Sequence, residues 1–272
     1  MNNSTAKTIF YLSFILIIIL LFSTSAGRAV NIQVAPRRFI FPGDHPLTEE
    51  VNVFNSSEQV IRVRVETEPP EGQPEEEYLG DWIKVYPRVI SIEPGKQRVV
   101  RFSLRTPEEE VPDGEYRSLL FFEELPPEED KNEKENKEDQ KPQGDEVSID
   151  FDLLTKIGIN LYGQFGEIEH KGQLRNTEIE NREKNIKIKG NFVNQGNAHL
   201  RMEVAVRVYN STDKLIREEN NKFVVHRGAE KDFAVEFAPE QKLKNGKVEL
   251  EFVHHDQVTG KESIIEEVTT EF

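Results

Sequence analysis

Residues 112–127 read PDGEYRSLLFFEELPP, which is a turn followed by an apolar run and a closing proline pair. Pro-Asp-Gly supplies residues that tight turns prefer, and Phe41-Pro-Gly43 and Glu93-Pro-Gly95 give similar signals elsewhere. The runs of strand character in this half are residues 30–34, 51–53, 60–65, 82–86, 99–104 and 118–122. Several alternate apolar and polar residues, so each strand turns one face to a core and the other to water. Many short strands with such turns predict an all-β sandwich.

A charged stretch interrupts this pattern at residues 126–146. It contains nine acidic and four basic residues and no large apolar side chain, so it cannot offset its ordering entropy by burial. A disordered loop is therefore predicted. Residues 147–153 then alternate strictly, and residues 155–162 continue as a strand. Because a lone strand is not stable, these residues must return to the preceding sheet, which favours a loop within the first domain over a linker between domains.

Strands resume after a polar segment, residues 164–184, which is predicted to connect two domains. Their runs are residues 186–193, 200–209, 222–225, 231–237, 247–253 and 263–269. The turns between them include Asn194-Gln-Gly-Asn197 and Asn245-Gly246. A first domain at residues 30–163 and a second, smaller β-sandwich at residues 185–272 are therefore predicted.

The first 29 residues have the pattern of a signal peptide, with Lys7, an apolar run at residues 9–22 and small residues after it. That run is shorter than the roughly 20 residues that a membrane-spanning helix needs. We therefore predict cleavage, export and no stable membrane insertion of the mature chain, with an uncleaved anchor as the alternative.

Composition limits the partners and the chemistry. The net charge of −15 is opposite to what phosphate binding requires, so nucleic acid is not an expected partner. The chain has no cysteine, which excludes disulfides and thiol chemistry. Because small exported animal domains often depend on disulfides, this composition favours the periplasm or cell envelope of a bacterium.

The first domain resembles the N-terminal domain of the periplasmic pilus-assembly chaperones, the PapD-like family. The similar stretches, in the family's order, are residues 36–43, 86–96 with 99–104, 112–127 and 147–162. The resemblance implies immunoglobulin-like β-sandwich domains, a non-enzymatic protein without cofactors, and pilin-like extracytoplasmic subunits as partners. The second domain is similar only to immunoglobulin-like modules in general.

In that family the seventh strand is added to the incomplete sheet of a subunit, where backbone hydrogen bonds give affinity and alternate side chains fill a groove. The matching side chains here are Ile149, Phe151 and Leu153, which share one face because the period of a strand is two. The alternative is that these three side chains pack the core of their own domain.

The family also anchors the C-terminal carboxylate of the subunit with two basic residues. One position matches Arg38, whose guanidinium suits a carboxylate. The other, a lysine in the family, is Gly158 here, and Lys156 on the same face is the predicted substitute. Two further departures are Gly163-Gln164 in place of an arginine-proline pair, and Arg117 in place of an acidic residue.

No motif in the sequence indicates catalysis, and no metal site is predicted. His254 and His255 are adjacent, so on a strand they point to opposite faces and cannot readily share a metal ion. Two other functions remain open, namely a structural or adhesive surface protein and a carbohydrate-binding module, for which Trp82 is the only tryptophan. The chaperone hypothesis predicts an open strand edge at residues 147–157, and the surface-protein hypothesis predicts a covered one.

Overall fold

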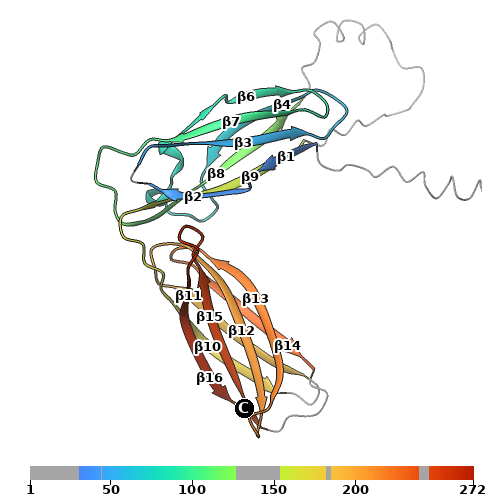
Figure 1. Ribbon diagram of the computed structural model, residues 1–272, viewed down its shortest axis with the longest axis vertical. Helices are drawn as coiled ribbons and strands as arrows, with labels where there is room; N and C mark the ends of the chain where they lie inside the picture. Colours follow the sequence, from blue (N-terminus) through green and yellow to red (C-terminus); the bar gives the residue numbers. More distant parts are fainter. Residues whose placement is uncertain (1–30, 44, 127–153, 182–184, 239–244) are drawn as a thin grey trace, which may run out of the picture.

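The computed structural model describes residues 31–43, 45–126, 154–181, 185–238 and 245–272. These residues form two β-sandwiches joined end to end at an angle (Figure 1). The prediction of an all-β fold is confirmed, because the only helical turns in the described residues are the short 3-10 turns η1 (Glu75–Glu77) and η2 (Gly80–Trp82). The predicted signal peptide and acidic loop lie outside the described residues. No helix among the described residues is long and apolar enough to cross a membrane.

The first domain consists of two sheets. The four-stranded sheet has the order β1 (Ile32–Ala35), β3 (Leu47–Asn55), β7 (Gln97–Leu104) and β5 (Ile83–Tyr86). The five-stranded sheet has the order β2 (Arg38–Pro42), β9 (Lys156–Phe165), β8 (Gly114–Leu125), β4 (Ile61–Glu68) and β6 (Val89–Ile92). The apolar run in residues 112–127 is therefore the central strand of its sheet.

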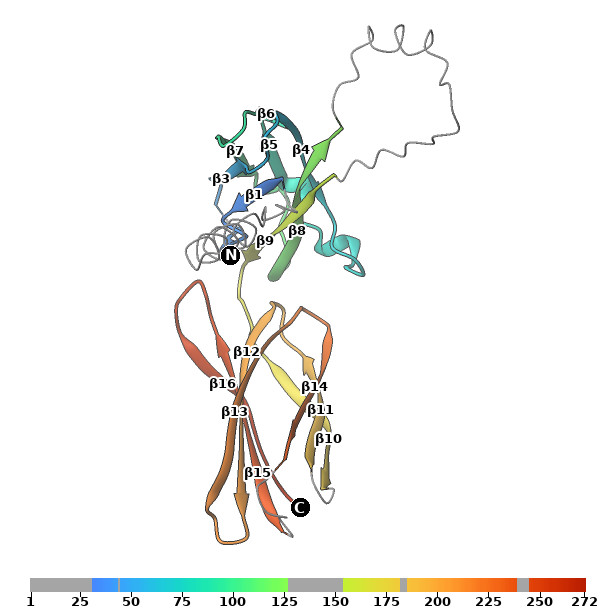
Figure 2. The same cartoon turned by 90° about the vertical axis from the view of Figure 1, so that its right-hand side faces the viewer.

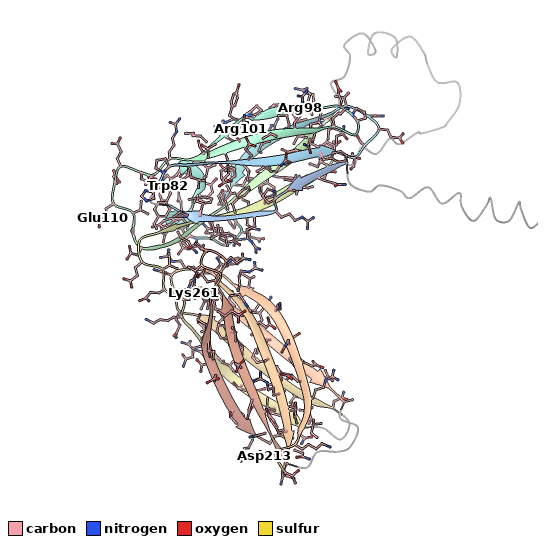
Figure 3. All side chains as sticks on the ribbon, in the orientation of Figure 1. Trp82, Arg98, Arg101, Glu110, Asp213 and Lys261 are labelled. Carbon is pink, nitrogen blue, oxygen red and sulfur yellow. The ribbon has the colours of Figure 1, made fainter. Side chains whose placement is uncertain are left out.

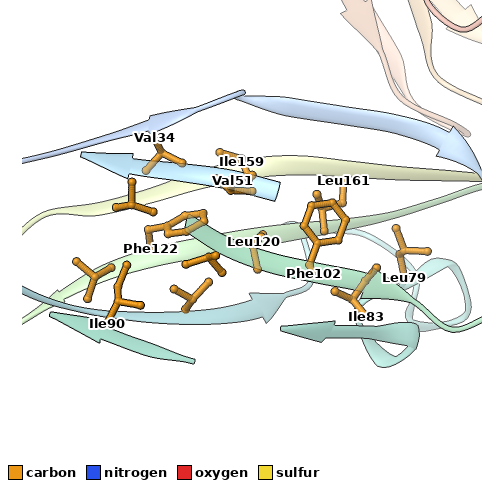
Figure 4. Packing of buried hydrophobic residues seen from close by; sticks show 14 of the residues in the cluster. Val34, Val51, Leu79, Ile83, Ile90, Phe102, Leu120, Phe122, Ile159 and Leu161 are labelled. Carbon is orange, nitrogen blue, oxygen red and sulfur yellow. The ribbon is translucent and has the colours of Figure 1, made fainter. Parts of the chain in front are cut away.

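The core of the first domain lies between these sheets, where alternate residues of each strand meet (Figure 4). Phe102 of β7 and Phe122 of β8 are completely buried and come from opposite sheets. The Phe102 ring meets Phe39 of β2 edge to face, with 4.9 Å between centroids. Burial of one such side chain stabilises the fold by about 1.5–3 kcal/mol.

The opening strand of the first domain changes sheets at Pro36. β1 pairs antiparallel with β3, whereas β2, only two residues later, pairs in parallel with β9 of the other sheet. β2 is short, and its register of Arg38 with Asn160 leaves the first residues of β9 beyond its reach. This change of sheet determines which part of β9 has a second neighbour.

The second domain also consists of two sheets. Their orders are β10 (Gly172–Asn181), β11 (Ile186–Asn194) and β14 (Glu230–Phe237), and β13 (Leu215–Val225), β12 (Leu200–Asn210), β15 (Gly246–His255) and β16 (Glu262–Glu271). Phe192 of β11 stacks on Phe252 of β15 across the core at 4.9 Å. All six predicted strands of this half are present.

β10 corrects the sequence analysis, which took residues 164–184 as a connecting segment. Residues 172–181 pair with β11 as an edge strand, so the connection is confined to the residues between β9 and β10. The strand was missed because a register shift between Arg175 and Glu178 breaks its alternation, and because an edge strand carries many exposed polar side chains.

The two domains meet at the end of the second sandwich that faces β8 and β9 (Figure 2). The Glu115 N–H of β8 donates to the carbonyl oxygen of Asn197 at 2.8 Å. Arg227, in the turn after β13, pairs with Glu77 of η1 through its Nε at 3.1 Å. The domain junction therefore joins β8 and η1 to the loops that precede β12 and follow β13.

Candidate functional site

The first residues of β9 have a paired strand on one side only. β8 pairs with β9 over its whole length, whereas β2 pairs only with residues 160–164. Thr155 extends the β8 ladder, because its carbonyl oxygen accepts the Glu124 N–H at 2.8 Å. No strand in the described part of the chain pairs with the other side of residues 155–159. We call these residues the open edge.

The direction of one hydrogen bond shows which amides face this open side. The Asn160 N–H donates to the carbonyl oxygen of Arg37 at 3.3 Å, away from β8. Amide direction alternates along a strand, so the N–H groups of Lys156 and Gly158 also point away from β8, and those of Ile157 and Ile159 point towards it. Unpaired backbone groups of this kind can pair with another chain.

Side chains on β9 alternate between the core and an outer face. Ile159 and Leu161 are completely buried, and Ile157 packs against the same core. The outer face carries Lys156, Gly158, Asn160 and Tyr162, together with the β8 residues opposite them, Arg117, Leu119, Phe121 and Glu123. The basic residues that the sequence analysis selected, Arg38 and Lys156, both lie on this outer face.

The structure does not bring Arg38 and Lys156 together. Arg38 is opposite Asn160, so Lys156 lies four residues away along the strand, about 13 Å. The Lys156 ammonium points instead to β4, where it is 2.5 Å from the Glu68 carboxylate and 4.3 Å from the centre of the Phe121 ring. The hydrogen bond to Glu68 raises the pKa of Lys156.

Arg117 is a cation near Arg38 to which the sequence analysis gave no role. Its Nη2 donates to the Asn160 side-chain oxygen at 3.0 Å, and its guanidinium carbon is 5.6 Å from the centre of the Tyr162 ring. Its Nε is buried without a hydrogen-bond partner. Burial raises the pKa of Tyr162, and the charges of Arg117 and Arg38 both oppose that rise.

Arg117 also lines a pocket of about 160 Å³ between the domains, together with Glu115, His226 and Arg227. Arg117 lines this pocket, and a guanidinium group is suited to bind a carboxylate. Only the pairing of β8 with β9 reveals this arrangement, because Arg117 and Asn160 are 43 residues apart in the sequence.

The remaining predicted residues, Ile149, Phe151 and Leu153, lie outside the described residues. Their role in strand addition stays a prediction. The described part of the predicted open edge, residues 154–157, has no strand on its second side among the described residues.

The alternatives to protein binding find little support in the geometry. No group of three or more side chains in the described ranges could hold a metal ion. His254 is 2% exposed, whereas His255 contacts Glu203 at 3.1 Å on the other side of β15. The ring of Trp82 lies 5.0 Å from that of Tyr116 within an aromatic cluster, so it does not form a flat, exposed surface for a sugar.

Comparison with known proteins identifies the first domain. Residues 31–141 match the family model described as pili and flagellar-assembly chaperone, PapD N-terminal domain. Over these residues the first domain is similar to the N-terminal domain of that family. The resemblance in the sequence is thereby confirmed for this domain, and the family match does not extend into the second domain. No curated protein matches the chain.

Several solved chaperone structures are similar to the whole chain. The YadV chaperone is 12% identical with a TM-score of 0.47, over 89% of this chain and 100% of that one. The E. coli chaperone DraB is 14% identical with a TM-score of 0.45, over 88% of this chain and 95% of that one. A chain of the Salmonella enterica complex of SafA pilin with SafB chaperone is 16% identical with a TM-score of 0.43, over 88% and 95%.

Proposed function

We propose that the protein is a non-enzymatic, PapD-like chaperone that binds pilin-like subunits by adding the open edge of β9 to their incomplete sheet. The observation that carries this proposal is that, among the described strands, residues 155–159 pair only with β8, within a domain that matches the pilus-chaperone family. An extended edge gives affinity through main-chain hydrogen bonds, and the N–H groups of Lys156 and Gly158 point to the side on which no described strand pairs.

The groove-filling side chains follow from the same strand. If β9 continues towards residue 147 in the bound state, Ile149, Phe151 and Leu153 share the face of Ile157 and Ile159, because side chains alternate with a period of two. Each would then fill a position in the subunit that its own missing strand leaves empty. The apolar face of β9 that packs the core of its own domain would thereby continue into the core of the partner.

A carboxylate anchor is the second part of the proposal. Arg38 was proposed from the sequence together with Lys156. It lies opposite Asn160, whose side-chain oxygen accepts a hydrogen bond from Arg117, whereas Lys156 is held by Glu68. We infer that Arg38 and Arg117 bind the C-terminal carboxylate of the subunit, and that Lys156 contributes less. The chain's signal-like first 29 residues and its family fit export to the bacterial periplasm or cell envelope.

Co-expression with a pilin-like subunit from the same organism tests strand addition. Phe151→Asp places a charge in the subunit's apolar groove, which costs enough to lower the recovered complex at least about tenfold. Ser148→Asp is the matched control, because it adds the same charge on the opposite face of the same segment and should leave the complex intact. Equal recovery with both variants would rule out strand addition through this segment and favour the surface-protein alternative.

A further inference from the structure

Four of the six histidines of this chain gather at the domain junction. His170 is in the connection between β9 and β10, His199 immediately precedes β12, His226 follows β13, and His254 lies near the end of β15. They come from four separate segments of the sequence. The ring contacts and charges among them connect the second domain to β8 and β9 of the first.

His199 is bound directly to the first domain. Its Nδ1 lies 2.7 and 2.8 Å from the two carboxylate oxygens of Glu115, and its backbone N–H donates to the same carboxylate at 3.2 Å. Both side chains are 4% exposed. Gln164 of β9 donates a further hydrogen bond to Glu115. This buried pair is the closest polar contact between the domains.

Tyr162 of β9 contacts two of the histidines. Its ring stacks on His199 with 4.4 Å between centroids, and it is nearly parallel to His226 at 6.5 Å. Arg117 of β8 lies over the same Tyr162 ring. His226 therefore faces an aromatic ring and a permanent positive charge of the first domain, which disfavours a second positive charge on its imidazole.

His254 and His170 form the second ring contact, with 4.1 Å between centroids. The Nδ1 of His254 accepts the Arg201 backbone N–H at 3.1 Å, so the ring is neutral with its proton on Nε2. That Nε2 is buried without a partner. A second proton on His254 would remove the acceptor for Arg201 and place a charge against His170, which belongs to the connection between the domains.

The surroundings of His226 also disfavour its protonated form. Burial lowers the pKa of His226 to about 4, helped by the charges of Arg117 and His199, while Glu115 acts in the opposite sense. His226 is thus uncharged at neutral pH. Tyr162 is neutral in this range, because burial raises its pKa from an already high value.

Burial also lowers the pKa of His254 to about 4. His170, His199 and His255 add to this effect, and Asp256 opposes it. The pKa of His170 is lowered too, chiefly by burial. All three rings thus resist protonation while they stay buried, and His254 also depends on His170, the ring of the interdomain connection that lies against it.

We propose that this histidine cluster makes the joint between the two domains a pH-sensitive hinge, which is fixed while His226 and His254 are neutral and loosens when these two residues bind protons. The sign follows from linkage, since a group whose pKa is lowered in the closed state favours the open state as pH falls from its ordinary pKa towards the lowered one. For His226, a change from the ordinary value of 6.5 to about 4 favours the open joint about thirtyfold at pH 5 if opening fully exposes the ring. The inference does not depend on the chaperone proposal.

Interdomain distance measured by single-molecule fluorescence transfer tests this hinge. The chain has no cysteine, so dyes can be attached at Arg98→Cys on β7 and Ser211→Cys after β12, both exposed. Figure 3 shows Arg98 and Asp213, which is two residues after Ser211, in different domains and far from the junction. High dilution matters, because the sequence pI is about 5.0 and uncharged protein associates.

We expect one narrow transfer distribution at pH 7.5, and a broadened or shifted one that develops between pH 6.5 and 4.5 while circular dichroism shows both sandwiches still folded. His226→Gln/His254→Gln should lose this transition. His255→Gln is the matched control and should keep it, because its ring contacts Glu203 and Glu262 instead of the junction. If the double variant fails to fold, His226→Gln and His254→Gln are each compared with His255→Gln in the same way.

A distribution that stays constant down to pH 4.5 with folded domains would overturn the hinge. The same holds if the domains unfold with no earlier change in distance, or if His226→Gln/His254→Gln opens over the same pH range as the unaltered chain.

Discussion

Phe121 lies against Gly158 so closely that a Cβ added at Gly158 would be 2.8 Å from the Phe121 Cε1. The two residues are directly opposite on β8 and β9. Gly158 is the position at which the pilus-chaperone family has a lysine. The ring of Phe121 therefore fills the space of the missing side chain, and Lys156 lies over the same ring. This substitution changes which cations can act on the outer face.

Gly158→Lys should therefore destabilise the first domain, although it restores the family's residue. The added side chain must displace the Phe121 ring, and overpacking of this kind typically costs about 1–3 kcal/mol. Urea unfolding measures the loss. Gly158→Lys combined with Phe121→Ala should be less destabilised than the sum of its two single changes. Strict additivity would mean that the ring and the new side chain do not compete.

The carboxylate anchor can be tested one cation at a time. Arg38→Ala and Arg117→Ala should each weaken binding of a subunit at least about tenfold, since a charge-assisted hydrogen bond contributes about 1.5–3 kcal/mol. Lys156→Ala should change it less than about twofold, as expected for an exposed ion pair. Calorimetry with subunits that end in a carboxylate or in an amide checks that the arginines bind the C-terminal carboxylate. With the amide form, neither arginine substitution should change the affinity. A larger loss with Lys156→Ala than with Arg117→Ala would contradict this assignment.

Glu115 and Glu123 are both on β8 and should respond very differently to substitution by alanine. Glu115→Ala leaves His199 buried without its carboxylate, which costs about 3–5 kcal/mol for a buried pair. Glu123 pairs with Arg64 at 3.6 Å with half of the arginine side chain exposed, so Glu123→Ala should cost less than about 1 kcal/mol. Thermal unfolding measures both changes. Similar small losses would show that the Glu115–His199 pair does not stabilise the junction.

The free energy of unfolding should depend on His254 in mildly acidic solution. Its pKa is about 4 in the folded chain and near 6.5 when exposed, so the unfolded state binds the proton first and stability falls as pH decreases from 6.5 towards 4. While the joint stays closed, His254 contributes about 2 kcal/mol of this loss between pH 7 and 4.5, and opening of the joint reduces that contribution. His254→Gln should flatten the pH dependence of denaturant unfolding by that amount. An unchanged slope would mean that His254 titrates normally in the folded chain.

The strands of the core could be predicted because their pattern is local. Residues 118–122 are an apolar run and residues 186–193 largely alternate, and both proved to lie in central strands, β8 and β11. β10 was missed because the bulge between Arg175 and Glu178 breaks its period and because its outer positions are polar. Edge strands carry less of the apolar signal that the prediction uses.

The site was less predictable, since its contacts join strands that are far apart in the sequence. The alternation of β9 predicted that Lys156 and Gly158 share one face, and this agrees with the register of the strands. The sequence could not show that Lys156 pairs with Glu68, or that Arg117 reaches Asn160, because both depend on side-chain directions across neighbouring strands. Arg117 was visible as a departure from the family, without a role.

Hydrogen exchange at individual amides of β9, followed by NMR in the free protein and in its complex with a pilin-like subunit, tests strand addition most directly. The N–H groups of Ile157 and Ile159 point to β8 and should exchange slowly in both states. Those of Lys156 and Gly158 point to the open side, so they should exchange fast in the free protein and become protected in the complex. Protection of Lys156 and Gly158 in the free protein, or continued fast exchange in the complex, would contradict the open edge as the binding site.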